Sequence, residues 1–314
     1  MLNNTQLVTA TTTLKSCVLV SRLVLLAVMA LVPFSATLAQ DAKKGVAKPA
    51  SPPPMPSALT RRTTRHEVRR FGYGGTLTIY GAPEGSVTVE AWPRNEIDIT
   101  ADIEWRADTE EELAQLAAVN NFVLDEGNTQ FQIITTGTHD RKFMKRVAKS
   151  FPKKLLAMPW RIDYRLRVPA VLDIDLFAGS GAINLDGVDG SVRINAGEAP
   201  TTLNLSGGDL VATIAGGPVR LRVAARSWRG RGATVRLVKG DLTIELPPDF
   251  NADIDAAILR HGRIENLYPQ LNPRERTAAP TERTLQSRAG AGGAVFLFEV
   301  GDGTIQIKPA TSDK

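Results

Sequence analysis

The stretch Gly179-Ser-Gly-Ala-Ile-Asn-Leu-Asp-Gly-Val-Asp-Gly-Ser-Val-Arg-Ile194 decides the fold. Two apolar couplets, Ile183/Leu185 and Val192/Ile194, stand 9 residues apart, each within a short alternation of apolar and polar residues. Such alternation is typical of a strand with one buried face, and the glycines between the couplets are typical of tight corners. Strands this short cannot bury their apolar side alone, so they must stack on neighbours along an axis.

The couplet recurs through the chain from Val168 onward. The first members of successive couplets are 9, 9 and 11 residues apart, and the series continues past residue 242. The couplets are Ile174/Leu176, Ile183/Leu185, Val192/Ile194, Leu203/Leu205, Leu210 with Ile214, Val219/Leu221, Val235/Leu237 and Leu242/Ile244. The pattern predicts an all-β protein, a β-solenoid or a stack of short β-sheets. An up-and-down β-sandwich is the alternative, but the shortness and number of the strands favour the stack.

The chain before residue 168 continues the strand pattern with one exception. Alternating apolar residues occur over 76–80, 87–92 and 97–103. The segment DTEEELAQLAAV, residues 108–119, instead has helical spacing, with acidic residues in its first turn and Asp108 as the expected N-cap. We expect one α-helix inserted near 108–119 in a β protein.

The N-terminus has the order of a secretory signal. Positive charge at Lys15 and Arg22 precedes an apolar run, 23–31, and small residues follow up to Ala39. We expect residues 1–39 to be a signal peptide cleaved after Ala39, which would remove Cys17 and place the protein in the periplasm or outside the cell. The alternative is a retained N-terminal membrane anchor.

The amino-acid composition and the position of the proline run predict where the tether, the folded domain and the tail begin and end. Residues 40–67 include the proline run 51–56 and are expected to be a disordered tether. Residues 68–308 are then a single β-stack domain, and 309–314 a tail. The single cysteine argues against a disulfide framework or a cysteine-rich zinc site, and three scattered histidines leave little for metal chemistry. A formal net charge of +5 is too small to predict a nucleic-acid partner, and no cofactor is expected.

The repeat resembles a known bacterial family. The runs 166–176 and 179–194, the Gly240-Asp-Leu-Thr-Ile-Glu-Leu-Pro segment and the closing Val300-Gly-Asp-Gly-Thr-Ile-Gln-Ile are similar to the bacterial putative-adhesin domain of unknown function, also called the toast-rack fold. The resemblance extends over about 68–308 and implies a β stack. It implies no shared catalytic residue. The chain departs from the family pattern in the basic segment 140–158 and at 226–232.

The segment 140–158 is the first candidate contact site. Its cations are Arg141, Lys142, Lys145, Arg146, Lys149, Lys153 and Lys154. A short basic helix near 140–151 would place Phe143, Val147 and Phe151 on one side, beside a basic face. That is the composition of a helix attracted to anionic lipid. The alternative is an excursion that packs its apolar side on the stack and leaves its lysines solvated.

The second candidate site surrounds a tryptophan. Arg226, Arg229 and Arg231 flank Trp228, with further arginines on neighbouring rungs. The arginines could bind an anionic glycan or phosphate while Trp228 stacks on it. The alternative is a solvated arginine-rich face.

No catalytic arrangement stands out in the sequence. Asp173 and Asp175 share a strand face, which is an arrangement that a glycan-active enzyme on a β-helix scaffold could use. Outward charges on a strand need no such role. We therefore predict a non-enzymatic, exported cell-envelope protein with an interaction or structural role. A membrane- or polyanion-associated sensor module is the alternative. The expected partners are a cell-surface glycan, an anionic lipid or an envelope protein.

Overall fold

The computed structural model describes residues 58–147, 150–275 and 280–311, which lie within one compact unit, Pro54–Lys314. The predicted signal peptide, most of the predicted tether and Lys149 lie outside the described residues. Within the described ranges, no helix is long and apolar enough to cross a membrane.

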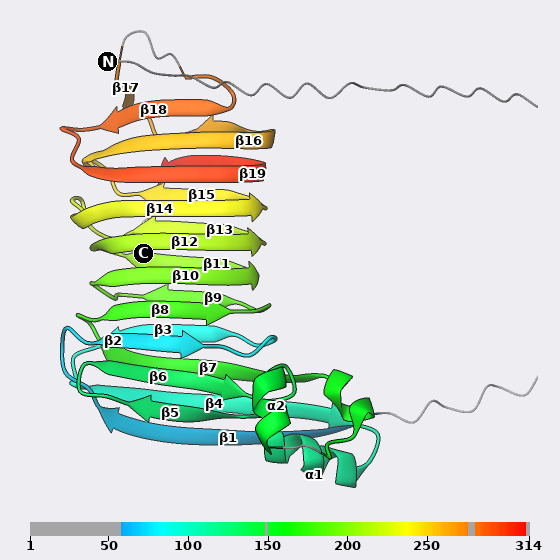
Figure 1. The fold of residues 1–314 in the computed structure, drawn as a ribbon. Helices are drawn as coiled ribbons and strands as arrows, with labels where there is room; N and C mark the ends of the chain where they lie inside the picture. The colour runs from blue at the N-terminus through cyan, green and yellow to red at the C-terminus, as the bar shows by residue number, and fades with distance from the viewer. Residues whose placement is uncertain (1–57, 148–149, 276–279, 312–314) are drawn as a thin grey trace, which may run out of the picture. The chain divides into compact units, whose positions relative to one another are not determined.

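The unit is a stack of two-stranded coils, which confirms the all-β stack expected from the couplets (Figure 1). The first strand of each coil belongs to one face, and the second strand belongs to the other. The first face contains β6 (Gln130–Thr136), β2 (Thr76–Tyr80), β8 (Asp173–Ala178), β10 (Ser191–Glu198), β12 (Gly207–Gly216) and β14 (Arg229–Lys239). The second face contains β7 (Trp160–Pro169), β3 (Val87–Trp92), β9 (Ile183–Asp186), β11 (Thr201–Leu205), β13 (Val219–Val223) and β15 (Leu242–Leu246).

Neighbouring strands on each face are parallel, and their register explains the couplet spacing. On the first face Ile174 pairs with Val192, and Val192 pairs with Leu210. On the second face Ile183 pairs with Thr201 in the same way. Each coil of this region thus takes 18 residues, which is two of the 9-residue steps seen in the sequence. A parallel ladder between successive coils is not the pairing of an up-and-down sandwich, so that alternative is wrong.

The C-terminal strand is inserted into the stack rather than added to its end. After β15 the chain continues to β16 (Ala252–Asn266), and β18 (Thr284–Ala289) then pairs antiparallel with β16 and with the short β17 (Leu271–Pro273). Strand β19 (Ala294–Pro309) then returns between β16 and the strands β14 and β15, and it is parallel to all three. The last strand of the chain, β19, therefore has hydrogen-bonded partners along both of its edges and is not an edge strand.

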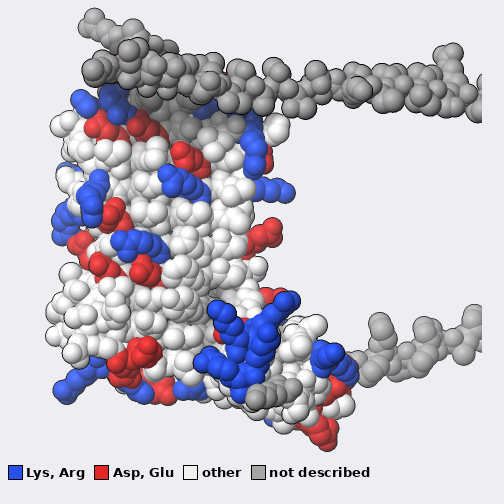
Figure 2. Space-filling view, in the orientation of Figure 1, with Lys and Arg blue, Asp and Glu red and all other residues white. Residues whose placement is uncertain are grey.

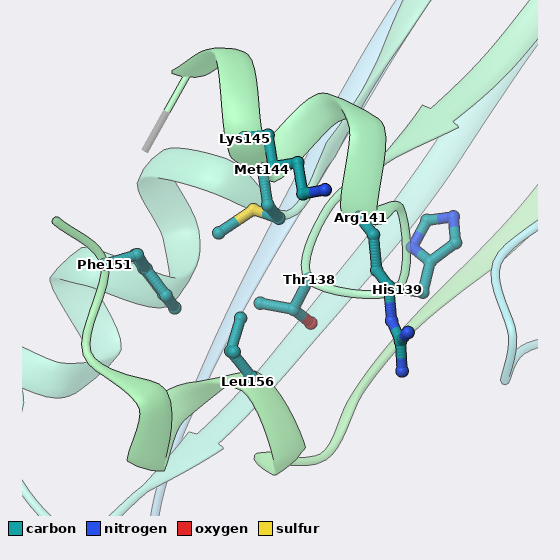
Figure 3. Close-up of a pocket in the computed structure, with 7 residues that line it drawn as sticks. All are labelled: Thr138, His139, Arg141, Met144, Lys145, Phe151 and Leu156. Atoms are coloured by element: carbon teal, nitrogen blue, oxygen red, sulfur yellow. The ribbon is translucent and has the colours of Figure 1, made fainter. Parts of the chain in front are cut away.

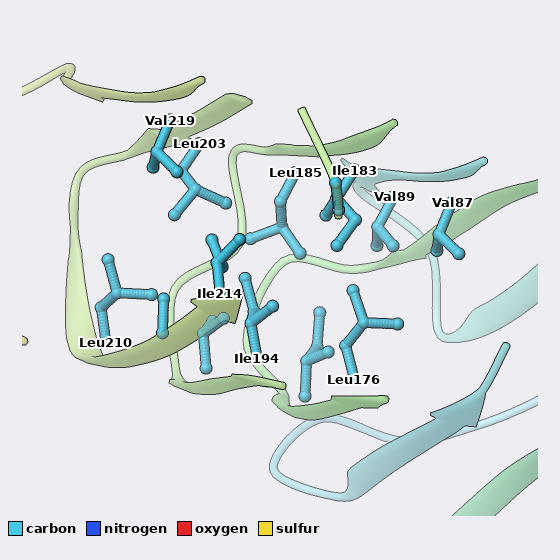
Figure 4. Packing of buried hydrophobic residues seen from close by; sticks show 14 of the residues in the cluster. Val87, Val89, Leu176, Ile183, Leu185, Ile194, Leu203, Leu210, Ile214 and Val219 are labelled. Carbon is cyan, nitrogen blue, oxygen red and sulfur yellow. The ribbon is translucent and has the colours of Figure 1, made fainter. Parts of the chain in front are cut away.

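The core lies between the two faces and runs from coil to coil. Inward side chains such as Leu176, Ile194 and Ile214 on the first face meet Leu185, Leu203 and Val219 from the second, and all are fully buried (Figure 4). The aliphatic side chains alternate with outward polar ones, as a strand with one buried face requires. Each added coil extends the same core instead of starting another.

Glycine is required where coils stack at the corners. Gly303 in β19 has φ +147°, and a Cβ there would lie 1.8 Å from the carbonyl oxygen of Gly240 in the coil beneath it. No side chain fits at that distance, and the backbone conformation itself is one that residues with a Cβ rarely adopt. The glycine-rich turns of the sequence thus reflect backbone contact between coils.

The other end of the stack is closed by antiparallel strands and a helix. Strand β4 (Glu96–Ala107) pairs with β7, β1 (Leu59–Arg70) pairs with β4, and β5 (Asn121–Glu126) pairs with β6. The helix α1 (Glu110–Val119) buries Leu113, Leu116 and Val119 against this end.

Two expectations about this end are corrected. The N-cap of α1 is Thr109, whose hydroxyl accepts a hydrogen bond from the backbone N–H of Glu112 at 3.2 Å, rather than Asp108. Residues 59–67 were expected to be tether but form most of β1, because their backbone continues the ladder on β4 and their arginines reach carboxylates on neighbouring elements.

Candidate functional site

The connection between β6 and β7, residues 137–159, protrudes beside α1 at the closed end of the stack (Figure 1). It contains α2 (Arg141–Val147) and the 3-10 helix η1 (Lys153–Ala157). The start of α2 is held by Asp140, whose Oδ1 accepts hydrogen bonds from the backbone N–H groups of Lys142 and Phe143 at 2.8 and 3.1 Å. The hydrogen bond from Phe143, then that from Lys142, keeps the pKa of Asp140 below its ordinary value despite partial desolvation.

The apolar side of α2 differs from the predicted stripe. Met144 is the buried residue of the helix, Phe143 is half-buried, and Val147 is 60% exposed. Phe151 lies after the helix and packs against the core as a half-buried residue. The predicted spacing of Phe143, Val147 and Phe151 assumed one continuous helix, whereas the chain turns before Phe151, so the three do not share a face.

The 3-10 helix is attached to α1 by ion pairs. The Lys154 ammonium lies 2.7 Å from Glu112 Oε1 and 3.1 Å from Asp108 Oδ2. Leu155, the next residue, is buried in the core. Lys154 therefore helps to hold this segment against α1, and its charge is balanced by two carboxylates.

Five other cations of the segment stay unpaired and exposed. Within the described part of the chain, none of them has a carboxylate at ion-pair distance. They are Arg141, Lys142, Lys145, Arg146 and Lys153, and we call them the basic surface. Figure 2 shows blue side chains gathered over α2 with little red among them.

The rest of the stack carries its charges mostly in pairs across neighbouring strands. Arg193 lies 3.2 Å from Asp175, Arg236 lies 2.7 Å from Glu299, and Arg288 lies 2.7 Å from Asp253. The paired strands place these side chains next to each other, so that their fields largely cancel. The unpaired charge at α2 stands out against this background.

A pocket opens between α2 and η1. Its volume is about 670 Å³, and it is lined by Thr138, His139, Arg141, Met144, Lys145, Phe151 and Leu156, which we call the insert pocket (Figure 3). His139 lies at its rim with its ring 5.4 Å from that of Trp160. This packing removes water from one side of the imidazole and lowers the pKa of His139, while the charge of Asp140 opposes the shift.

The second predicted site has a different role. Trp228 is only 7% exposed, packs edge-to-face on Phe296, and donates from Nε1 to the carbonyl oxygen of Gly208 at 3.0 Å. It is a core residue and cannot serve as a stacking platform. The sequence pointed the other way because arginines on both sides suggested an exposed position. Trp228 lies just before β14, where its contacts with Phe296 and Gly208 hold it in the core.

The arginines around Trp228 are exposed but partly engaged. Arg229 lies 2.7 Å from Asp189, and Arg231 lies 3.4 Å from Asp209. Arg226 lies in the exposed loop before β14. The structure does not bring them to the basic surface, since β2, β8, β10 and β12 separate β6 from β14.

The carboxylates considered for catalysis have structural partners. Asp173 Oδ1 accepts the backbone N–H of Ser191 at 2.7 Å, one coil away, and Asp175 pairs with Arg193. Over the ranges that the structure describes, no three His, Cys, Asp or Glu side chains are placed to hold a metal ion.

An exposed apolar row on the first face was not recognised in the sequence. Tyr80 and Phe177 are paired across β2 and β8, are 41% and 40% exposed, and stack with ring centroids 5.2 Å apart. Ile134 and the exposed Val123 continue the row on β6 and β5. The available signal was Phe177 itself, an aromatic residue on the strand face that Asp173 and Asp175 mark as outward.

No family model and no curated protein matches this chain. Solved structures are similar to this chain, among them the following two. A putative cell adhesion protein from Clostridium sporogenes has a TM-score of 0.40 at 11% sequence identity, over 79% of this chain and 100% of that one. A putative adhesin from Bacteroides fragilis has a TM-score of 0.27 at 10% identity, over 79% of this chain and 97% of that one. Both bear the adhesin description that the sequence resemblance predicted. At these TM-scores the likeness carries no argument about what this chain binds.

Proposed function

We propose that this protein is an exported, non-catalytic cell-envelope protein whose β stack is a rigid support for a contact with an anionic lipid surface. The observation that carries the proposal is the set of five unpaired cations on α2 and η1, at one end of a stack whose other charges are largely paired. Unpaired surface cations keep their full field for an external anion, whereas paired ones do not.

The choice of lipid rather than another polyanion rests on apolar neighbours. Val147 on α2 is 60% exposed and Leu156 on η1 is 43% exposed, so apolar groups accompany the cations. An anionic membrane attracts each nearby Lys or Arg by about 1 kcal/mol and accepts apolar side chains below its headgroups. A soluble polyanion would use only the charges.

The non-catalytic part of the proposal is supported by the carboxylates. Asp173 and Asp175 are engaged in hydrogen bonds and ion pairs between coils. Their positions serve the stacking of coils, which removes the main reason to consider glycan hydrolysis. The carboxylate pair of a glycosidase needs free oxygens on both sides of a bound sugar.

Vesicle sedimentation tests the lipid contact. The protein should bind vesicles that contain phosphatidylglycerol, should not bind pure phosphatidylcholine vesicles, and should be released in high salt because the Debye length falls to about 3 Å at 1 M. Changing Arg141, Lys142, Lys145 and Arg146 together to Gln should weaken binding at least about tenfold.

The matched control removes the same charge elsewhere. Arg193, Arg229, Arg231 and Arg236, each next to a carboxylate on the stack, should be replaceable by Gln with little effect on vesicle binding. Equal loss in both variants, or binding to an anionic glycan but not to vesicles, would contradict the lipid contact.

Export is tested separately by the mature N-terminus. Cell fractionation followed by N-terminal sequencing should find the protein in the envelope fraction, starting at Gln40. An intact N-terminus in the inner membrane would favour the retained anchor instead.

A further inference from the structure

The insert pocket combines an apolar floor with a cationic rim. Three apolar side chains converge on it: Met144 from α2, Phe151 from the segment between the two helices, and Leu156 from η1. Arg141 and His139 lie on the side away from Phe151 (Figure 3). Its volume of about 670 Å³ falls within the 300–1,000 Å³ that is usual for sites that hold a small molecule.

The rim charges lie on one side of α2. Arg141 and Lys145 are four residues apart and therefore adjacent on the helix surface, and both line the pocket. Neither has an ion-pair partner among the residues that the structure describes. Two cations above an apolar cavity select a ligand with one anionic end and one apolar end.

We propose that the insert pocket binds a single-chain anionic amphiphile of the long-chain carboxylate class, with the chain against Met144, Phe151 and Leu156 and the carboxylate between Arg141 and Lys145. A small polar anion would leave the apolar floor wet. A neutral apolar molecule would partly desolvate two cations without giving them a partner. The inference rests on the proposed function in one respect, the unpaired cations, but it needs no membrane.

The other two lining residues, Thr138 and His139, are consistent with an apolar floor and a rim charged by Arg141 and Lys145. Thr138 is buried with its polar groups engaged, since its N–H donates to Asn120 Oδ1 at 2.8 Å and its hydroxyl accepts from Trp160 Nε1 at 2.9 Å. Thr138 therefore forms part of the pocket wall and does not bind the carboxylate of the ligand. His139 has a lowered pKa through desolvation and is neutral near pH 7, so the charge at the rim comes from Arg141 and Lys145.

Titration calorimetry with decanoate, below its micelle concentration, tests the inference. The protein is purified after expression of the full chain, in the processed form that the cell yields. Decanoate should bind with one site, and each methylene removed on going to octanoate should weaken binding about fourfold. The neutral 1-decanol should bind at least about tenfold more weakly than decanoate.

Two double variants of α2 provide the decisive comparison. R141E/K145E removes the rim cations and should weaken decanoate binding at least about tenfold. K142E/R146E makes the same charge change on the same helix at residues that do not line the pocket, and it should bind decanoate like the unmodified protein. Leu156→Gln, at a residue already 43% exposed, should also weaken binding without unfolding the segment.

The outcomes separate this inference from the lipid contact. Absence of decanoate binding, equal loss in both double variants, or no dependence on chain length would overturn the pocket proposal. Vesicle binding measured on the same variants reports on the proposed function, because a surface contact should lose affinity in both. Decanoate binding without vesicle binding would uphold the pocket and contradict the membrane contact.

Discussion

The ammonium nitrogen of Lys154 in η1 lies 2.7 Å from Oε1 of Glu112 in the first turn of α1. The two residues are 42 positions apart, and their contact fixes the basic segment to the closing helix of the stack. Replacing Lys154 by Met should loosen η1 while leaving global stability nearly unchanged, because exposed ion pairs contribute little to folding. Amide hydrogen exchange at Leu155 and Met158, whose N–H groups close the 3-10 turns, should accelerate severalfold.

The neighbouring residue and the pH dependence give the controls. Lys153→Met should leave exchange unchanged, since Lys153 has no ion pair in the described part of the chain. The hydrogen bond from Lys154 lowers the pKa of Glu112 below 4.5. The ion pair between Lys154 and Glu112 is therefore fully formed above pH 4.5 and is lost as the pH falls through the lowered pKa. Protection of these amides that does not decrease as the pH falls through the lowered pKa of Glu112 would contradict this role.

Glu104 in β4 should contribute to stability in a pH-dependent way. Its buried carboxylate lies 2.7, 2.6 and 3.4 Å from Arg62, Arg106 and Arg161. Burial alone would raise the pKa of Glu104, but hydrogen bonds from Arg106 and Arg62 and the charge of Arg161 outweigh it, so the pKa is lowered. Glu104→Gln should reduce the free energy of unfolding by about 1–2 kcal/mol near neutral pH.

The stability that Glu104 contributes should vanish in acid. A lowered folded-state pKa contributes stability above the ordinary value of 4.5 and loses it as pH falls through the lowered value. Denaturant titrations at pH 7 and pH 3 should therefore show the difference between Glu104→Gln and the unmodified protein shrinking at low pH. Glu110→Gln, which removes an exposed carboxylate next to Arg61, should change stability by less than about 0.5 kcal/mol.

Gly303 should not tolerate even a methyl group. Its φ of +147° and the carbonyl oxygen of Gly240 at 1.8 Å from a Cβ predict that Gly303→Ala costs at least about 2 kcal/mol of unfolding free energy. Gly72→Ala, where nothing lies within 4 Å and φ is not positive, is the matched control and should change stability by less than about 0.5 kcal/mol. Similar stabilities for the two variants would mean that the coils can separate at this corner without cost.

The hydroxyls of Thr135 and Tyr164 should behave as a coupled pair. Both side chains are buried, and their oxygens are 2.7 Å apart. Thr135→Val or Tyr164→Phe alone leaves one buried hydroxyl without its partner and should cost about 1–3 kcal/mol, whereas the double variant should cost less than the sum. Thermal unfolding of the four proteins measures the coupling energy, and strict additivity would exclude the pair as a unit.

The stacked architecture was predictable because it follows from local pattern. The couplets around Ile174, Ile183 and Val192 alternate with period two, and residues that alternate in this way must place one side in the core whatever their partners are. The helix near 108–119 was equally visible from its spacing. The cap was misassigned by one residue, since Asp108 and Thr109 are both good caps and only the backbone path selects Thr109.

Long-range placement was not predictable in the same way. The sequence alone determined the period of the stack, the need for glycine at its corners and the basic composition of 140–158. Tertiary structure decided that β19 enters between β15 and β16, that Trp228 faces inward and that Lys154 is bound by Glu112. Hydrophobic period depends on each residue and its near neighbours, whereas the pairing of a charge depends on which distant strand or helix lies beside it. The five cations left unpaired on α2 and η1 are for that reason a property of the fold.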